Sequence, residues 1–275
     1  MKYLYGRNVF ITGGSSGIGL ATAELFAANG YIVYAGSRHP AAEVRSFPGG
    51  GEIRPVMIDV CDDESVEKAA ETVLAQADIG IVIHCAGIGI ACSGEESPPD
   101  AVAALFETNF TGVLRVNSRF LPHLRRRGGG RGVCIMIGSV ASVYAIPFQS
   151  HYSASKAAVD SYSRALRMEL RDFGVRVSVI NPGDTATGFT GARRYEIDED
   201  SPYYNACRAA VAKMEKDERS GRPPSSVARE ILKLCERSNP PVHKVVGADY
   251  KLLVFLRRLL PGAAIEFILR KMYLG

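Results

Sequence analysis

The chain has 275 residues and a mass of 29.7 kDa, which is within the size range of one α/β domain. Its composition is 47% hydrophobic and 23% charged, so it can bury a core large enough to offset the entropy of folding, and a disordered chain is excluded. The formal net charge of +4 is too small to indicate nucleic-acid binding by itself. We therefore expect a globular protein without a nucleic-acid partner.

Short β-rich runs alternate with segments of helical pattern along the chain. We predict six buried strands, at residues 8–11, 31–36, 53–58, 79–85, 133–137 and 175–180. We predict four helices between them, over 17–29, 62–76, 101–121 and 152–173. Strand, helix and strand at this spacing indicate a parallel sheet covered on both faces. With right-handed crossovers, the pattern predicts an α/β fold with a doubly wound, Rossmann-like sheet in a single domain over 1–275.

Two regions interrupt this alternation. Residues 184–225 are polar and rich in Gly and Pro, and a loop of that length in a compact domain is usually a lid or a binding segment. We therefore predict a substrate loop over about 184–225. The last segment, about 250–275, carries two apolar pieces with basic residues between and around them, and we predict a helical tail.

The cysteines and the apolar runs indicate in which cellular compartment the protein is found. The six cysteines, at positions 61, 85, 92, 134, 207 and 235, lack metal-site spacing, so we expect reduced thiols and no metal. No apolar run approaches the 18 residues of a spanning helix, and residues 1–7 contain no signal-peptide core. These patterns favour a cytoplasmic protein.

The first predicted strand runs into a glycine-rich turn, from Thr12 to Gly19, with the spacing TGxxxGxG. Glycines let the backbone turn tightly and approach a pyrophosphate, and the following helix offers unpaired N–H groups to that anion. The strand before it and the helix after it distinguish this motif from a plain strand-to-helix turn, the alternative interpretation. We expect six residues to bind a dinucleotide here: Gly13, Ser15, Ser16, Gly17, Ile18 and Gly19.

The end of the second strand bears on the choice between the two nicotinamide dinucleotides. An acidic residue there would hold a ribose 2′-hydroxyl and repel a 2′-phosphate. Ser37 and Arg38 occupy this place instead, and a guanidinium is suited to bind a phosphate. The pair predicts NADP(H) as the cofactor; in the alternative interpretation Arg38 is only a surface charge.

Tyr152 and Lys156 are four residues apart, so they share one face of the predicted helix. A tyrosine has an ordinary pKa of about 10. A lysine cation about 4 Å away contributes roughly 4 kcal/mol at an effective dielectric constant of about 20, enough to lower the tyrosine pKa by up to about three units. The pair can thus give or take a proton near neutral pH, although YxxxK is also common on plain exposed helices.

Together these motifs resemble the short-chain dehydrogenase/reductase family, over roughly residues 7–190. The remaining matches follow in the family's motif order. They are Asp59 and Val60, which match the pair that contacts adenine; Ala86 and Gly87, the last half of an Asn-Asn-Ala-Gly turn; Asn109 in Asn-Phe-Thr-Gly; Ser139, 13 residues before Tyr152; and Pro182, Gly183, Thr185 and Thr187, in the turn beside the nicotinamide.

The resemblance implies a role for each catalytic candidate. Tyr152 would be the general acid or base, and Lys156 would lower its pKa and hold the nicotinamide ribose. Ser139 would hydrogen-bond the substrate oxygen as charge develops on it. Asn109, through its backbone carbonyl, would position a water in a proton relay. NADPH would supply the hydride. The sequence departs from the family at His84 and Cys85, where two asparagines are common; that motif supports the central strands rather than the reaction.

We expect the substrate pocket to be lined by residues 141–148 and by the segment after Pro182. Val143, Tyr144 and Phe148 are apolar or aromatic, which favours a hydrophobic substrate beside Ser139 and Tyr152. The tail resembles that of the hydroxysteroid and retinol dehydrogenase branch. The predicted function is therefore NADP(H)-dependent reduction of a lipophilic ketone that resembles a steroid, a retinoid or another lipid.

Three questions remain open from the sequence. The reaction could instead be the reduction of a 3-oxoacyl thioester, or the protein could sense NADP(H) without catalysis. The tail either packs on the domain and closes the pocket, which we favour, or lies on a membrane surface. The helices over 101–121 and 152–173 resemble those that pair across a two-fold axis in the family, which implies a homodimer or homotetramer.

Overall fold

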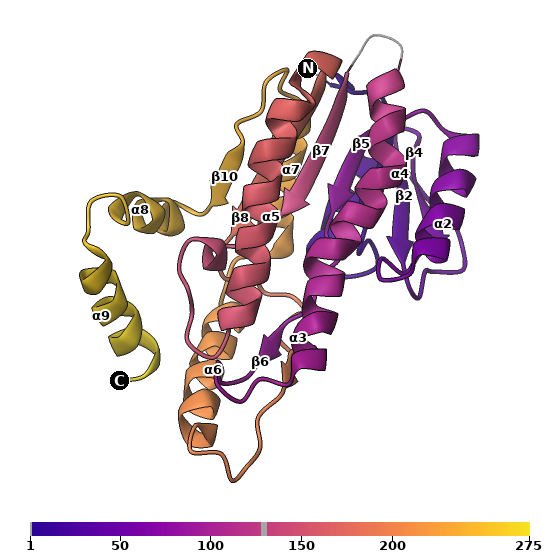
Figure 1. The fold of residues 1–275 in the computed structure, drawn as a ribbon. Helices are drawn as coiled ribbons and strands as arrows, with labels where there is room; N and C mark the ends of the chain where they lie inside the picture. Colours follow the sequence, from indigo (N-terminus) through magenta and orange to yellow (C-terminus); the bar gives the residue numbers. More distant parts are fainter. Residues whose placement is uncertain (1, 128–130) are drawn as a thin grey trace.

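The computed structural model describes residues 2–127 and 131–275. At its centre is one eight-stranded sheet (Figure 1). All neighbouring strands are parallel except the last pair in the order, which is antiparallel. In spatial order the strands are β10 (His243–Val246), β8 (Val175–Pro182), β7 (Gly132–Ile137), β5 (Ile79–His84), β1 (Asn8–Thr12), β2 (Ile32–Ser37), β4 (Gly51–Met57) and β3 (Arg45–Phe47).

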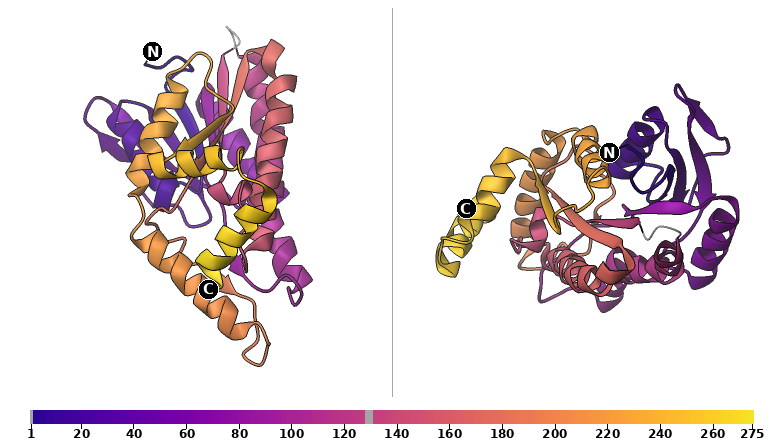
Figure 2. Two further views of the ribbon diagram at one scale, coloured as in Figure 1. Left: turned by 90° about the vertical axis from the view of Figure 1, so that its left-hand side faces the viewer. Right: turned by 90° about the horizontal axis from the view of Figure 1, so that it is seen from above.

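Helices cover both faces of this sheet (Figure 2). On one face lie α1 (Gly17–Ala28) and α7 (Pro224–Cys235), which pack against each other. On the other lie α2 (Asp63–Gln76), α4 (Gly112–Arg126) and α5 (Ser150–Glu169). The remaining elements are α3 (Pro99–Phe106), α6 (Tyr204–Arg219), α8 (Ala248–Leu256), α9 (Gly262–Tyr273), the short parallel pair β6 (Ile90–Ala91) and β9 (Arg194–Tyr195), a π-helical turn (Glu107–Thr111) and two 3₁₀ turns (Val140–Ser142 and Arg171–Phe173).

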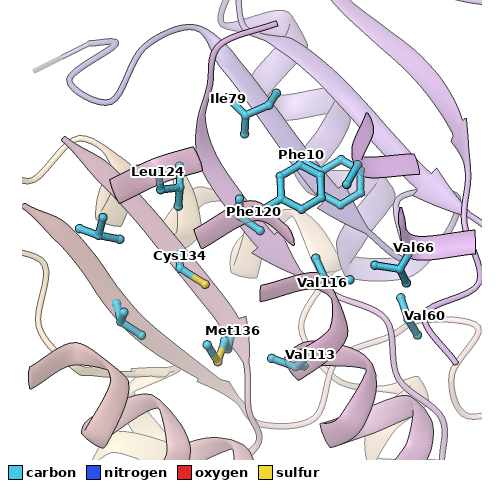
Figure 3. Close-up of a cluster of buried hydrophobic side chains, with 14 of the residues drawn as sticks. Phe10, Val60, Val66, Ile79, Val113, Val116, Phe120, Leu124, Cys134 and Met136 are labelled. Carbon is cyan, nitrogen blue, oxygen red and sulfur yellow. The ribbon is translucent and has the colours of Figure 1, made fainter. Parts of the chain in front are cut away.

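The core has two parts because each central strand buries side chains on both faces. In β1, Val9 and Ile11 point to the side of α1 and α7, whereas Phe10 points to the side of α2 and α4. Phe10 stacks on Phe120 with a centroid separation of 4.3 Å (Figure 3). This two-sided burial explains why the strands appear in the sequence as continuous apolar runs rather than alternating ones.

The doubly wound α/β fold predicted from the sequence is confirmed, with local differences. The predicted helix over 101–121 is interrupted by the π-helical turn, and β3 and β10 were not predicted. Residues 184–225 are not one continuous loop, because they contain β9 and α6. Helix α6 was not predicted because its apolar residues, although at helical spacing, lie between charged ones. Its buried residues are Cys207, Ala210, Val211 and Met214.

The strand order places the candidate motifs at one edge of the sheet. The order reverses at β1 and β5, and in open α/β sheets ligands bind past the carboxyl ends of the strands at such a switch point. The tail helices α8 and α9 extend from one side of the domain, next to β10 (Figures 1 and 2). Among the described residues, none of the helices is both long enough and apolar enough to cross a membrane.

Candidate active site

A cavity of about 1160 Å³ opens at the carboxyl ends of the strands. It brings together residues that are as far apart in the sequence as Gly13 and Tyr273. Every residue expected to bind the cofactor lines it: Gly13, Ser15, Ser16, Gly17, Ile18, Gly19, Ser37, Arg38, Asp59, Val60, Ala86, Gly87, Tyr152, Lys156, Pro182, Gly183, Thr185 and Thr187.

The turn after β1 is packed so tightly that two of its glycines admit no side chain. Gly13 has a φ of +67°, and a Cβ there would lie 2.7 Å from the backbone N of Ala86. A Cβ on Gly19 would overlap the carbonyl oxygen of Gly13. Ser16 precedes α1 but makes no side-chain cap, so the first N–H groups of the helix face the cavity without that partner. This is the cradle that a pyrophosphate needs.

At the end of β2 two polar side chains lie beside this turn. The hydroxyl oxygen of Ser37 is buried without a hydrogen-bond partner among the described residues. Arg38 is exposed at the cavity and makes no ion pair within the described ranges. A hydroxyl and an unpaired guanidinium at this place fit a ribose 2′-phosphate.

Two more strand ends close the cofactor side of the cavity. After β4, Asp59 accepts a hydrogen bond of 2.9 Å from the backbone N–H of Cys61, which fixes the turn that presents Val60. After β5, Gly87 lies where a Cβ would be 3.3 Å from Oδ1 of Asn109 and 3.7 Å from Nζ of Lys156. Gly87 therefore lies next to both of these groups.

The four catalytic candidates meet around the first turn of α5. Tyr152 and Lys156 are one turn apart, with Nζ of Lys156 5.7 Å from the centroid of the tyrosine ring. Nζ donates a hydrogen bond of 2.9 Å to the carbonyl oxygen of Ile137, at the end of β7. The hydroxyl of Ser139 accepts from the backbone N–H of Ala141 at 3.0 Å and is hydrogen-bonded to Tyr152.

Burial dominates the protonation of this pair. It raises the pKa of Tyr152 to about 12, against the smaller lowering effects of the Ser139 hydrogen bond and the Arg193 charge. It lowers the pKa of Lys156 to about 8. We expected Lys156 to lower the pKa of Tyr152, but its ammonium is bonded to Ile137 and desolvation is the larger effect. Tyr152 therefore stays protonated at neutral pH in this structure.

Asn109 lies in the π-helical turn between α3 and α4, a geometry that often marks functional sites. Its side-chain oxygen accepts from the backbone N–H of Ile88 at 2.8 Å. Its amide nitrogen donates to the carbonyl of Ile88 and to the hydroxyl of Ser155. The side chain thus joins the turn after β5 to α5. Asn109 itself does not line the cavity.

The substrate side differs from the prediction. Tyr144 and Ser139 line the cavity, but Val143 and Phe148 do not. Val140 and Ala141 of the 3₁₀ turn line the cavity, and so does Tyr144, which follows the turn. Phe148 packs instead against a small separate cluster formed with Ala91, Cys207 and Val211. These contacts come from β6 and α6, which were not predicted.

A buried ion pair near Tyr152 was also not predicted. The guanidinium of Arg193 has no exposed side-chain surface and is bonded to the carboxylate of Glu218. With the amide oxygen of Gln149 facing it, Arg193 also donates to Gln149 at 2.8 and 3.1 Å. The ring of Phe189 packs between them and Tyr152, with a centroid distance of 5.6 Å to the tyrosine. These residues come from the start of α5, the segment after β8, and α6. No local sequence signal indicates that they meet.

The tail completes the wall of the cavity. Leu253 of α8 and Leu269, Met272 and Tyr273 of α9 line it. The hydroxyl of Tyr144 donates to the carbonyl of Leu253 at 2.5 Å. Because residues 269, 272 and 273 repeat at helical spacing, the amphipathic pattern of the tail was the one signal in the sequence for this wall.

Comparisons with known proteins bear on the family of this chain. A short chain dehydrogenase family model matches residues 7–198. A 3-ketodihydrosphingosine reductase of Bacteroides thetaiotaomicron is 34% identical, over 96% of this chain and 97% of that protein. Retinol dehydrogenase 8 of Bos taurus is 27% identical, over 94% and 87%.

Two solved structures, each 25% identical, share the fold. A short chain dehydrogenase of Burkholderia cenocepacia in complex with NADP has a TM-score of 0.73, with 98% of each chain covered. One of Burkholderia phymatum in complex with NAD has a TM-score of 0.78, with 94% of this chain and 95% of that chain covered. By its matched residues, its fold and the assembly of its motifs around one cavity, this chain belongs to the short-chain dehydrogenase/reductase family of oxidoreductases.

Proposed function

We propose that this chain uses NADPH to reduce the ketone of a long-chain lipid to a secondary alcohol. One observation carries the proposal: a single cavity joins Tyr152 to the apolar side chains of the tail. A carbonyl at the tyrosine would leave an attached hydrocarbon chain against Leu253 and Leu269, where burial of apolar surface favours binding. The similarity to a 3-ketodihydrosphingosine reductase supports the same substrate class.

The preference for NADPH over NADH rests on the end of β2. The unpartnered hydroxyl of Ser37 and the exposed guanidinium of Arg38 are both free to bind a 2′-phosphate, and the carboxylate that would repel it is absent from these two positions. When bound, NADPH would supply the hydride to the carbonyl carbon.

The residues around Tyr152 then handle the proton. The phenol, protonated because burial raises its pKa to about 12, donates its proton to the carbonyl oxygen as negative charge develops there. The hydroxyl of Ser139 accepts from the backbone N–H of Ala141, and its O–H donates a second hydrogen bond to the carbonyl oxygen of the substrate. The ammonium of Lys156, 5.7 Å from the centroid of the tyrosine ring, and the charge of Arg193 stabilise the phenolate that remains.

One carboxylate on the cavity wall bears on which lipid ketone is bound. Asp184, Asp217 and Glu218 line the substrate side, but Glu218 is paired with Arg193 and Asp217 with Lys213. Asp184 makes no ion pair within the described ranges, so its carboxyl group is the one that would attract the amine of a long-chain amino ketone such as 3-ketodihydrosphingosine. The thioester remains the second candidate reaction, since its 3-ketone would meet Tyr152 in the same way. A sensor without catalysis is disfavoured because Tyr152 and Lys156 are both present on one helix face.

A ketone panel tests the proposal. Oxidation of NADPH, followed by its absorbance, should be fastest with 3-ketodihydrosphingosine and slower with a steroid ketone, a retinoid, acetoacetyl-CoA and a small polar ketone. A higher kcat/KM for acetoacetyl-CoA than for every lipid ketone would overturn the substrate class. Absence of turnover with the whole panel, together with NADPH binding, would favour a sensor.

We propose also that the chain acts as a homodimer or homotetramer in the cytoplasm. Met168 on α5 is 72% exposed, and a helix pair formed across a two-fold axis would cover such a side chain. All six cysteines are unpaired, as in reducing compartments. Sedimentation at micromolar concentration that detects only monomers would contradict the assembly.

A further inference from the structure

The outer face of the tail is apolar although it faces solvent. Leu252 and Phe255 of α8 and Leu259 just after it are 59%, 54% and 65% exposed. Leu252 and Phe255, three residues apart, share one face of α8, and Leu259 follows in the turn after the helix; these three residues form the apolar stripe. On α9, Phe267 is 62% exposed and Ile268 46%. This run of large exposed hydrophobic side chains is unusual for a protein surface and indicates a binding surface.

The same segment carries most of the net charge. Residues 248–275 contain five basic side chains, Lys251, Arg257, Arg258, Arg270 and Lys271, and two acidic ones, Asp249 and Glu266. This excess of three compares with +4 for the whole chain, so the remaining nine-tenths of the sequence is almost neutral. Asp249 is in addition paired with Arg222 of the domain at 2.7 Å.

The first tail helix is held to the domain in one orientation. The hydroxyl of Tyr250 donates to the carboxylate of Asp184 and accepts from the backbone N–H of the same residue. The ring of Tyr250 fills the space where a Cβ on Gly183 would lie. Tyr144 bonds the carbonyl of Leu253 one turn further on. With its inner side fixed to the cavity wall, α8 can present only its other side outward.

We propose that the outer faces of α8 and α9 bind the surface of an anionic lipid bilayer. The apolar stripe would insert at the level of the acyl chains while the basic side chains contact the headgroups. A second copy of the chain fits this face less well, because a two-fold contact would set the same positive residues against each other. Lipid phosphates supply the opposite charge.

The proposal also gives the substrate a short path. The inner faces of the same two helices, at Leu253, Leu269 and Met272, line the cavity that ends at Tyr152. A lipid ketone would pass from the bilayer beneath the tail without crossing water, which is costly for a long hydrocarbon chain. This part rests on the proposed function; the binding surface does not.

Vesicle flotation of the full chain tests the surface. The protein should float with vesicles of phosphatidylcholine and phosphatidylglycerol and much less with phosphatidylcholine alone. The pair Leu252→Gln and Phe255→Gln, and separately the pair Arg257→Glu and Arg258→Glu, should each lower the partition coefficient by about tenfold or more. The matched control is Val44→Gln with Met57→Gln, which removes two side chains that are 54% and 64% exposed elsewhere on the molecule and should leave flotation unchanged.

Three results would overturn the proposal: no flotation with either vesicle, equal flotation with both, or unchanged flotation of the tail variants. Loss of a dimer in sedimentation on changing Leu252 and Phe255, without any loss of flotation, would assign the stripe to a second copy instead. The same variants are also assayed for reduction of a water-soluble ketone, a reaction that needs neither the stripe nor a vesicle. This assay measures catalysis apart from vesicle binding, so it distinguishes failure of the surface proposal from failure of the proposed function.

Discussion

Nε2 of His84 lies 2.9 Å from Oδ1 of Asn117, and both side chains are buried. His84 is at the end of β5 and Asn117 is on α4, so this hydrogen bond joins the sheet to the helices on one face. Nδ2 of Asn117 donates further to the hydroxyl of Tyr162 on α5. Because Oδ1 can only accept, His84 donates from Nε2 as a neutral imidazole. The histidine thus supports the central strands where the family commonly has asparagine.

This bond predicts a pH dependence of stability. Burial lowers the pKa of His84 to about 4 from an ordinary value of 6.5. Between these values the unfolded chain binds a proton that the folded one does not, so the free energy of unfolding should fall as the pH drops from about 6.5 to 4, by roughly 3 kcal/mol in total. His84→Asn, which retains a donor toward Asn117, should lose this slope. Urea unfolding across the range measures it, and an equal slope in the variant would contradict the assignment.

Tyr152→Phe should lower kcat by about 10²-fold or more with NADPH and a lipid ketone, because only the proton donor is removed. NADPH binding, measured by fluorescence titration, should change little. Tyr162→Phe is the matched control, since Tyr162 lies on the same helix but outside the cavity. Substantial turnover by Tyr152→Phe would show that another group supplies the proton.

Lys156 should set the alkaline limb of the pH–rate profile. Burial lowers its pKa to about 8, so the ammonium is present below that pH and is lost above it. We expect kcat for carbonyl reduction to be constant below pH 8 and to decline above it. Lys156→Arg should move the decline to higher pH, and Lys156→Ala should impair both turnover and cofactor binding. A flat profile up to pH 10 in the unmodified protein would exclude this role.

Arg38→Ala should raise the KM for NADPH by about tenfold or more and leave that for NADH nearly unchanged. The physical reason is the loss of a charge-assisted bond to the 2′-phosphate. Arg126→Ala, at the end of α4 and outside the cavity, is the control. If the unmodified protein bound NADPH and NADH equally, the preference for NADP(H) would be wrong.

Glu218→Gln should destabilise the fold by about 3–5 kcal/mol, because it leaves the buried guanidinium of Arg193 without its counter-charge. The charge of Glu218 also raises the pKa of Tyr152, so its removal should lower that pKa. Lys213→Gln, which breaks an exposed pair on the same helix, should cost less than about 1 kcal/mol. Urea unfolding compares the two, and equal losses would show that the buried pair has no special importance.

The sequence by itself determined the features that depend on neighbouring residues. TGxxxGxG requires a glycine at position 19 because the turn between β1 and α1 brings backbone atoms into contact within one short segment: a Cβ on Gly19 would overlap the carbonyl oxygen of Gly13. Tyr152 and Lys156 meet because four residues make one helical turn. The alternation of continuous apolar runs with segments of helical pattern was sufficient to predict the α/β fold.

Only the tertiary structure decided what depends on distant segments. Arg193, Glu218 and Gln149 meet from three separate segments of the chain, and no spacing in the sequence joins them. Phe148 does not line the expected pocket because it packs against apolar side chains of α6. That helix was not predicted, because its apolar residues lie between charged ones. Tyr152 has a raised rather than a lowered pKa because the elements packed over it exclude water. Desolvation is a property of everything that surrounds a group, so it emerges only when the whole chain has folded.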